Sequence, residues 1–179
     1  MGKSIDEKIQ ENHIIFIHSQ MNAAQTNKVI MNLMSWNRAS EKIEINIYLS
    51  AQAWDFVNTM AIYDVLKNIN NPITIFCIGD VRGLATVLLT TASKGKRYAL
   101  KHTVFHIDQP FGGIDAGSVQ QTEVEIAARE ATLERDTFEA ILAEAFNKPI
   151  AQIHEDAEMR RKLTAQEALE YGLIDEILE

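Results

Sequence analysis

The segment 72–108 decides the fold, and its centre is the heptapeptide Gly79-Asp80-Val81-Arg82-Gly83-Leu84-Ala85. The apolar, β-branched run 73–78 before it is typical of a strand buried on both faces. The small and apolar residues 84–91 after it predict an interior helix, with cations in its last turn and Gly95 as its C-cap. At a strand-to-helix turn of this kind, many hydrolases present a nucleophile at the helix N-terminus. Here the turn offers only the side chains of Asp80 and Arg82.

Composition limits the classes of protein that the chain can belong to. Its 179 residues are 46% hydrophobic and 23% charged, which suits one well-packed core and predicts a single domain. The net charge of −8 argues against a nucleic-acid partner, because phosphate binding needs a cationic surface. Cys77 is the only cysteine, so no internal disulfide can form. The polar N-terminus lacks the apolar segment of a signal peptide, and no stretch approaches the ~18 apolar residues of a membrane span. We therefore expect a cytoplasmic protein without a membrane partner.

Apolar periodicity predicts strands that alternate with helices along the first half of the chain. The predicted strands are 13–17, 44–49 and 73–78, and the predicted helices are 22–37, 55–69 and 84–91. This alternation favours an α/β fold with a largely parallel sheet and right-handed crossovers. Strands at 98–100 and 103–108 are expected to extend the sheet, and residues 1–12 are expected to form a short helix or a loose arm.

A long helical pattern dominates the second half, from about 118 to 147. Its ~30 residues far exceed the mean helix length of ~11–12 residues, and its apolar stripe is narrow and flanked by charge. Because a small sheet cannot cover such a helix, part of the stripe is expected to pack on another subunit. A short helix at 150–158 follows. Thr164 and Glu167 form a capping-box pattern for a helix that ends at Gly172, and residues 173–178 are predicted to close the chain as a strand or turn.

Several runs, in order and at their spacings, resemble those of the proteolytic subunit of the ATP-dependent Clp protease, ClpP, which has a crotonase-like fold. The runs are Ile47-Tyr48-Leu49, Ala61-Ile62-Tyr63-Asp64, Lys94-Gly-Lys-Arg-Tyr-Ala-Leu100, Gln109-Pro-Phe-Gly-Gly113, Glu125-Ile-Ala-Ala-Arg-Glu130, Thr164-Ala-Gln-Glu-Ala168 and Glu170-Tyr-Gly-Leu-Ile-Asp175. The resemblance implies one ClpP-like domain over 1–179. Its mostly parallel sheet would form a head, about 1–113 and 150–179, and the long helix a protruding handle, about 114–149. It also implies seven-membered rings, usually stacked in pairs through their handles around a proteolytic chamber.

The chain departs from this family where the family carries its catalytic triad. The family's nucleophilic Ser follows Gly-x-Ala-Ala, and Gly83 takes that position here. The family's His lies in an Ile-His-Gln-Pro run, whose counterpart Ile107-Asp108-Gln109-Pro110 has Asp108 instead. Counting from the flanking matches puts Arg160 at the position of the acidic third member, with reversed charge. Gly83, Asp108 and Arg160 thus occupy the Ser, His and Asp positions.

The oxyanion-hole positions depart from the pattern as well. The family's Asn-Ser-Pro-Gly-Gly run corresponds to residues 50–54, which place Trp54 at the second Gly, and Leu84 is the other oxyanion-hole position. Loss of a triad costs on the order of 10⁶ in turnover, and the residual rate depends on the oxyanion hole and binding, which differ here too. The chain is therefore expected to be catalytically inactive and similar to the ClpR-type paralogues that form rings beside active ClpP subunits.

Partner contacts are expected to be other ClpP-like subunits, in a homo- or hetero-heptameric ring. In the family an aromatic pocket receives loops of the Clp ATPase, an unfoldase. Tyr48 and Tyr98 are retained at this pocket, whereas Asn46 and Asn68 stand where aromatic residues are expected. Docking of an ATPase is therefore left open. So is the usual ring-to-ring lock, because Met159-Arg160 replaces the family's Arg-Asp pair.

An enzymatic alternative rests on His106 and Asp108, which lie two apart on a strand and so face one side, where they could form a dyad near Gly83. The chain would then be an active Clp-type peptidase with an unorthodox site. Alternatively it would be a crotonase-like hydrolase acting on an acyl thioester, with Asp108 and Asp80 as acids. The competing interpretation pairs Asp108 with Arg160 or Arg82 by charge. His102, His106 and Asp108 do not complete a metal-ligand set, so no metal and no cofactor are expected.

Overall fold

The computed structural model describes residues 2–19, 21–51, 55–110 and 121–179. Its helices are α1 (Ile5–Glu11), α2 (Ala23–Ala39), α3 (Phe56–Asn68), α4 (Ala85–Leu89), α5 (Gln121–Ala145), α6 (Ile150–Glu158) and α7 (Ala165–Tyr171). Its strands are β1 (Ile14–His18), β2 (Ile45–Ser50), β3 (Ile73–Cys77), β4 (Asp80–Arg82), β5 (Arg97–Leu100), β6 (Val104–Ile107), β7 (Arg161–Thr164) and β8 (Glu176–Leu178). Helices and strands alternate along the first half, as the periodicity predicts.

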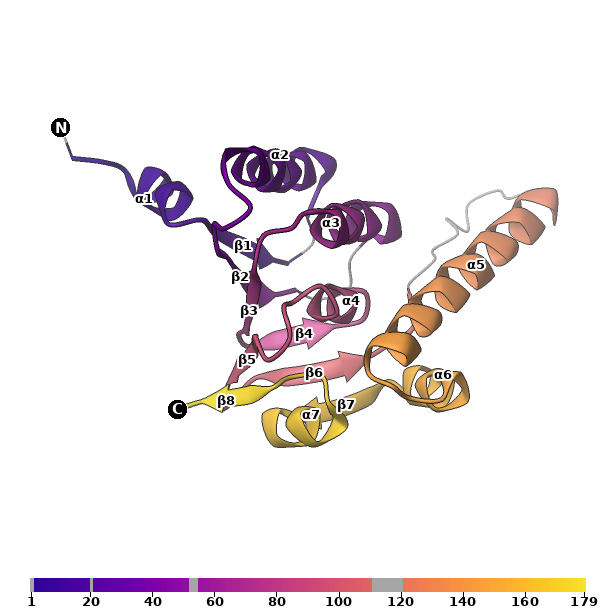
Figure 1. The fold of residues 1–179 in the computed structure, drawn as a ribbon. Helices are drawn as coiled ribbons and strands as arrows, with labels where there is room; N and C mark the ends of the chain where they lie inside the picture. Colours follow the sequence, from indigo (N-terminus) through magenta and orange to yellow (C-terminus); the bar gives the residue numbers. More distant parts are fainter. Residues whose placement is uncertain (1, 20, 52–54, 111–120) are drawn as a thin grey trace.

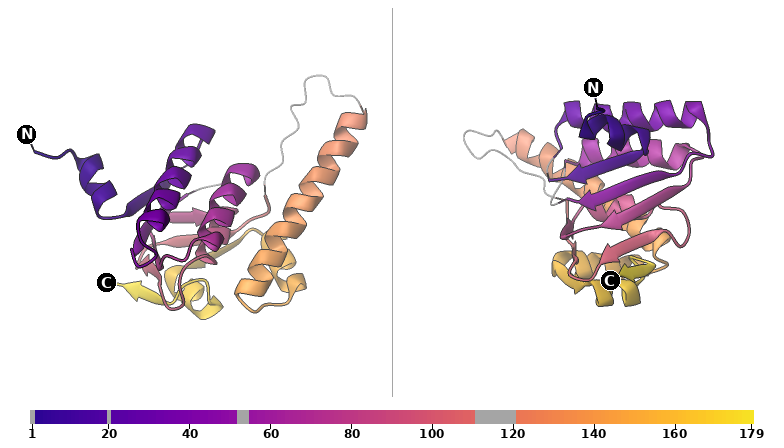
Figure 2. Two further views of the ribbon diagram at one scale, coloured as in Figure 1. Left: turned by 45° about the horizontal axis from the view of Figure 1, so that its top comes forward. Right: turned by 90° about the vertical axis from the view of Figure 1, so that its left-hand side faces the viewer.

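The larger sheet is entirely parallel, in the order β1-β2-β3-β5-β8. Helices α2, α3 and α4 lie along one of its faces, as Figure 1 shows. In the right-hand view of Figure 2 the strands of this sheet lie in front of these helices. The fold is thus the mixed α/β architecture with a mostly parallel sheet that the sequence predicts, and it fits the ClpP/crotonase-like class.

Alternate residues of each strand enter the core between the sheet and its helices. Ile47 and Leu49 of β2 are fully buried there with Leu33 of α2 and Ile62 of α3. All five residues of α4 are buried, which agrees with the interior helix expected at 84–91, although the helix is shorter. Its C-cap is Thr90, so the prediction of Gly95 as the cap is wrong. Gly95 instead has a φ of +76° in the turn before β5.

A second, smaller sheet of β4, β6 and β7 was not foreseen in the sequence. Strand β4 pairs with β6 in parallel, and β6 pairs with β7 in the antiparallel sense. The segment 103–108 was expected to extend the larger sheet, and this prediction is wrong. Its strand β6 instead forms the middle of the smaller sheet. Strand β4 has only three residues and a charged one at each end, so its apolar alternation is too short to predict.

Helix α5 runs out from the two sheets, as the left-hand view of Figure 2 shows. Its C-terminal half enters the core through Phe138 and Leu142, both fully buried. Toward the other end Ile126 and Leu133 are 54% and 62% exposed. The predicted helix at 118–147 is thereby observed over Gln121–Ala145, and its apolar stripe is covered at only one end.

Capping residues mark helix ends where the sequence places them. The Thr164 side chain and Glu167 complete the capping box of α7, and Gly172 ends that helix with a φ of +94°. Asp55 caps α3 by accepting a hydrogen bond from the backbone N–H of Asn58.

In the part of the chain that the structure describes, no helix is both long and apolar enough to cross a membrane.

Candidate functional site

The candidate site lies where β4 meets α4, and backbone hydrogen bonds fix its position. The Gly83 N–H donates to the carbonyl of His106 (3.0 Å), and the Arg82 N–H donates to that of Ala51 (2.9 Å). Parallel pairing sets Arg82 opposite His106. The strand-to-helix turn is therefore held against both β2 and β6, and the end of β6 lies beside it.

Gly83 and Asp108 are neighbours in space, as the sequence predicts. A Cβ built on Gly83 would lie 3.8 Å from the Asp108 Cβ, which is ordinary contact distance, so a side chain would have room. The Gly83 φ of +57° belongs to the left-handed region that costs other residues about 1–2 kcal/mol. The requirement for Gly is thus conformational rather than steric.

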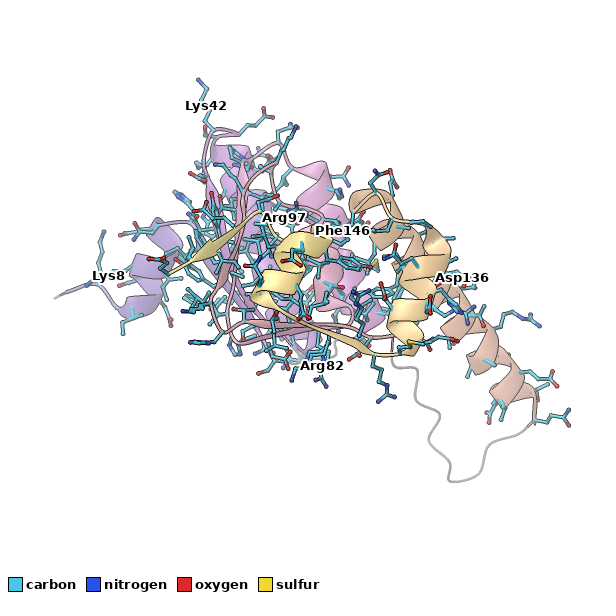
Figure 3. All side chains as sticks on the ribbon, turned by 90° about the horizontal axis from the view of Figure 1, so that it is seen from below. Lys8, Lys42, Arg82, Arg97, Asp136 and Phe146 are labelled. Carbon is cyan, nitrogen blue, oxygen red and sulfur yellow. The ribbon has the colours of Figure 1, made fainter. Side chains whose placement is uncertain are left out.

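Four side chains near Gly83, namely Asp80, Arg82, His106 and Asp108, form what we call the β4–β6 charge cluster. Arg82 Nε lies 3.5 Å from Asp108 Oδ2, and Arg82 Nη2 lies 3.9 Å from Asp80 Oδ2. His106 Nε2 lies 3.4 Å from Asp80 Oδ1 and 3.2 Å from Arg82 Nη2. Arg82 therefore contacts the other three, and it lies along the smaller sheet in Figure 3.

Burial reduces the solvent contact of the charged and titratable groups in this cluster. The Asp108 side chain is only 6% exposed, whereas that of Arg82 is 36% exposed. Burial lowers the pKa of His106 below its ordinary value, and the nearby Arg82 cation lowers it further, against the opposing effect of the two aspartates. The imidazole is thus neutral near pH 7 and can accept a hydrogen bond from Arg82.

The cluster satisfies its own polar atoms incompletely. Asp80 Oδ1, Arg82 Nε and Asp108 Oδ1 are buried and have no hydrogen-bond partner among the residues that the structure describes. A buried polar atom left in this state costs about 1–3 kcal/mol. The Arg82 guanidinium and the two carboxylates are therefore close enough to compensate one another's charge, but they are not arranged as a hydrogen-bonded structural pair.

Nucleophilic catalysis needs a hydroxyl or thiol within reach of a base, and the described residues place none at Gly83. The nearest hydroxyl on α4 belongs to Thr86, which is buried and donates to the Gly83 carbonyl (2.7 Å). The Cys77 thiol is also buried, and burial raises its pKa strongly, so the reactive thiolate is disfavoured.

The other predicted site residues are spread around this centre. Leu84 is buried at the N-cap of α4. Arg160 is exposed, has a φ of +49° and directly precedes β7, whose Arg161 is registered with Ile107. Trp54 lies outside the described residues. The structure thus brings Gly83, Asp108 and Arg82 together with Asp80 and His106, the residues that the enzymatic alternative also assigned to this site.

A metal centre finds no support in the described part of the chain. No group of three or more His, Cys, Asp or Glu side chains is arranged there to hold an ion. His102 lies in the turn between β5 and β6, apart from the strand that carries His106.

Tyr48 and Tyr98, predicted at a docking surface, belong to a stacked row across the larger sheet that we call the aromatic row. Its members are Phe16, Tyr48, Phe76 and Tyr98, one from each of four neighbouring strands. Neighbouring ring centroids are 5.0, 5.0 and 5.3 Å apart. Sequence reasoning missed Phe16 and Phe76, although their places in the parallel register of these strands would have found them.

Comparison with known proteins gives consistent results. The family model described as Clp protease matches residues 2–179. An ATP-dependent Clp protease proteolytic subunit from Dehalococcoides mccartyi is 37% identical over 166 residues, covering 93% of this chain and 82% of that protein. ATP-dependent Clp protease proteolytic subunit 1 from Rhodopirellula baltica is 31% identical over 175 residues, covering 98% of this chain and 76% of the other.

Proposed function

The chain belongs to the Clp protease family, and from this premise we propose that it is a catalytically inactive, ClpR-type subunit of a Clp-type protease ring. Gly83, Asp108 and Arg160 stand at its Ser, His and Asp positions. The observation that carries the proposal is the Gly83–Asp108 contact. A position without a side chain lies beside a buried carboxylate whose nearest cation is Arg82, 3.5 Å away.

The chemistry of the cluster supports this role. A general base must accept a proton from the nucleophile, whereas the Asp108 carboxylate faces the Arg82 guanidinium at 3.5 Å. His106, the other candidate base, lies 3.2 Å from the Arg82 guanidinium, which occupies a ring nitrogen that a base needs free. The unorthodox dyad of His106 and Asp108 therefore lacks both a nucleophile and an available base.

Assembly is the function left to such a chain. The half-exposed stripe of α5, with Ile126 and Leu133, suits contact with a second subunit of similar shape. We place the chain in the cytoplasm, as one head-and-handle unit, in a homo- or hetero-heptameric ring. The aromatic row is the surface on which a Clp ATPase would dock, with Tyr48 and Tyr98 as its proposed contact residues.

Native mass spectrometry of the chain, alone and mixed with an active Clp proteolytic subunit from the same cell, tests the proposal. A ring that contains both chains is expected. A fluorophosphonate probe, which labels nucleophilic serines, should modify the active chain in that ring and leave this one unmodified. A chain that stays monomeric in every mixture, or one that takes up the probe, would contradict the proposal.

A further inference from the structure

Helix α5 is joined to α6 by a cluster of charged side chains that plays no part in the candidate site. Glu139 is one of the three buried residues of α5, beside Phe138. Its side chain is 6% exposed, which is rare for a carboxylate unless a partner compensates its charge. The partner of Glu139 therefore determines how firmly the C-terminal half of α5, which we call its root, is held against the core.

That partner is His154 of α6. Its Nδ1 lies 2.8 Å from Glu139 Oε1, a hydrogen-bond distance. Arg135 of α5 approaches the same oxygen only to 4.0 Å, and its guanidinium is hydrogen-bonded to Asp136 at 2.9 Å. His154 thus provides the direct link between the buried carboxylate and the neighbouring helix.

Three charged groups act on His154. Glu139 and Arg135 belong to α5, and Glu158 belongs to α6, with its Oε1 3.4 Å from His154 Nε2. The hydrogen bond to Glu139 raises the pKa of His154 above its ordinary value, the charge of Glu139 and then that of Glu158 add to this effect, and Arg135 opposes it. The His154 side chain is 39% exposed, so protons reach it from solvent without any opening of the core.

We propose that His154 is a pH-sensitive latch that fastens α5 to α6. When the imidazole carries its proton, it forms ion pairs with Glu139 and Glu158, and the root of α5 is fixed. When the proton leaves, a neutral imidazole can still donate one hydrogen bond to Glu139, but the buried carboxylate loses its nearest positive charge.

The direction of the pH effect follows from linkage. The pKa of His154 is higher in the folded chain than in the unfolded chain. Its contribution to stability is therefore fully present at pH values below the unfolded-state pKa of ~6.5. The contribution is then lost as pH rises through the higher folded value. The latch rests on the α5–α6 contact and not on the proposed lack of catalysis, so either can fail without the other.

Hydrogen exchange of the α5 and α6 amides in the full chain tests the latch, between pH 6 and pH 9 and corrected for intrinsic exchange rates. Protection near Glu139 is expected to fall a few-fold as pH rises, the scale of a part-exposed ion pair. His154→Gln should show the lower protection at both ends of the range. His154→Lys, which keeps its charge to about pH 10, should stay protected throughout.

The matched control is His102→Gln, which removes an exposed histidine from the β5–β6 turn and should behave like the wild type. Glu139→Gln keeps the shape of the buried side chain and should abolish the pH dependence even if His154→Gln folds poorly. The latch is overturned if wild-type protection does not change with pH, or if His154→Gln retains the wild-type change.

Discussion

Two of the arginine–aspartate pairs in the described part of the chain, Arg97–Asp175 and Arg82–Asp108, differ in almost every respect. Arg97 binds Asp175 through Nε at 2.9 Å and through Nη2, and Nη1 donates to the Gly172 carbonyl at 2.8 Å. Arg82 approaches Asp108 only once, at 3.5 Å, and within the described part of the chain its Nε has no hydrogen-bond partner. Figure 3 shows the two arginines in separate places, with Arg97 beside Phe146.

The pKa of Asp175 illustrates what a complete pair achieves. Burial by itself would raise the pKa of Asp175, yet the hydrogen bonds from the side chain and backbone of Arg97 lower the pKa below its ordinary value. The pair ties β5 to the turn before β8 and works as a structural bond. The Arg82–Asp108 pair neutralises charge without good geometry, which agrees with the proposed absence of a working triad at this site.

Disruption of the complete pair should have the largest effect. Asp175→Asn leaves the Arg97 guanidinium, whose side chain is 20% exposed, without its anion. We expect a loss of about 2–4 kcal/mol in the free energy of unfolding, measured with urea. Lys96→Ala, which breaks an exposed pair with Glu44, is the control and should change the free energy by less than about 1 kcal/mol.

Removal of Arg82 should cost less. Arg82→Ala leaves the Asp108 carboxylate buried without a cation and is expected to lower the free energy of unfolding by about 1–3 kcal/mol. Asp108→Asn, which removes the need for a cation, should be nearly neutral. The contrast between the two pairs disappears if a double-mutant cycle finds the same coupling energy for Arg82–Asp108 as for Arg97–Asp175.

Gly83→Ser probes the centre of the site. The positive φ of Gly83 should make this change cost about 1–2 kcal/mol, while the 3.8 Å spacing to Asp108 lets the protein fold. No peptidase activity should appear, because the Asp108 carboxylate beside the new hydroxyl is paired with the Arg82 guanidinium. Thermal unfolding and hydrolysis of a fluorogenic peptide check both parts, and hydrolysis by this single variant would show that a working base is present.

The smallest effect concerns His106 and pH. Because the pKa of His106 is lowered in the folded chain, the unfolded chain binds the proton more readily. The contribution of His106 to stability is therefore present above the unfolded-state pKa of ~6.5, and it is lost as pH falls through the lower folded-state pKa. The stability difference between the wild type and His106→Gln should therefore shrink from pH 7 to pH 5. A difference that grows over this range would mean that Asp80 and Asp108, not burial and Arg82, control the imidazole.

Much of this molecule follows from its sequence. Ile47 and Leu49 alternate with polar residues and become buried strand positions, and Thr164 with Glu167 caps α7 as their spacing predicts. The smaller sheet does not follow, because β4 and β7 depend on tertiary pairing with β6 rather than on a local pattern. The Gly83–Asp108 contact was expected from the family motifs. The sequence also placed Asp80 in the strand-to-helix turn, but its ion pair with His106 depends on the pairing of β4 with β6, which no local pattern encodes.

The most direct test of the central claim is hydrolysis of fluorogenic peptides and casein by the purified chain, beside an active Clp proteolytic subunit. We predict that the chain, Asp108→Ala and His106→Ala all give the rate of the blank. Turnover that remains through purification and disappears when Asp108 or His106 is changed would contradict the claim, because the charge cluster would then be a catalytic site.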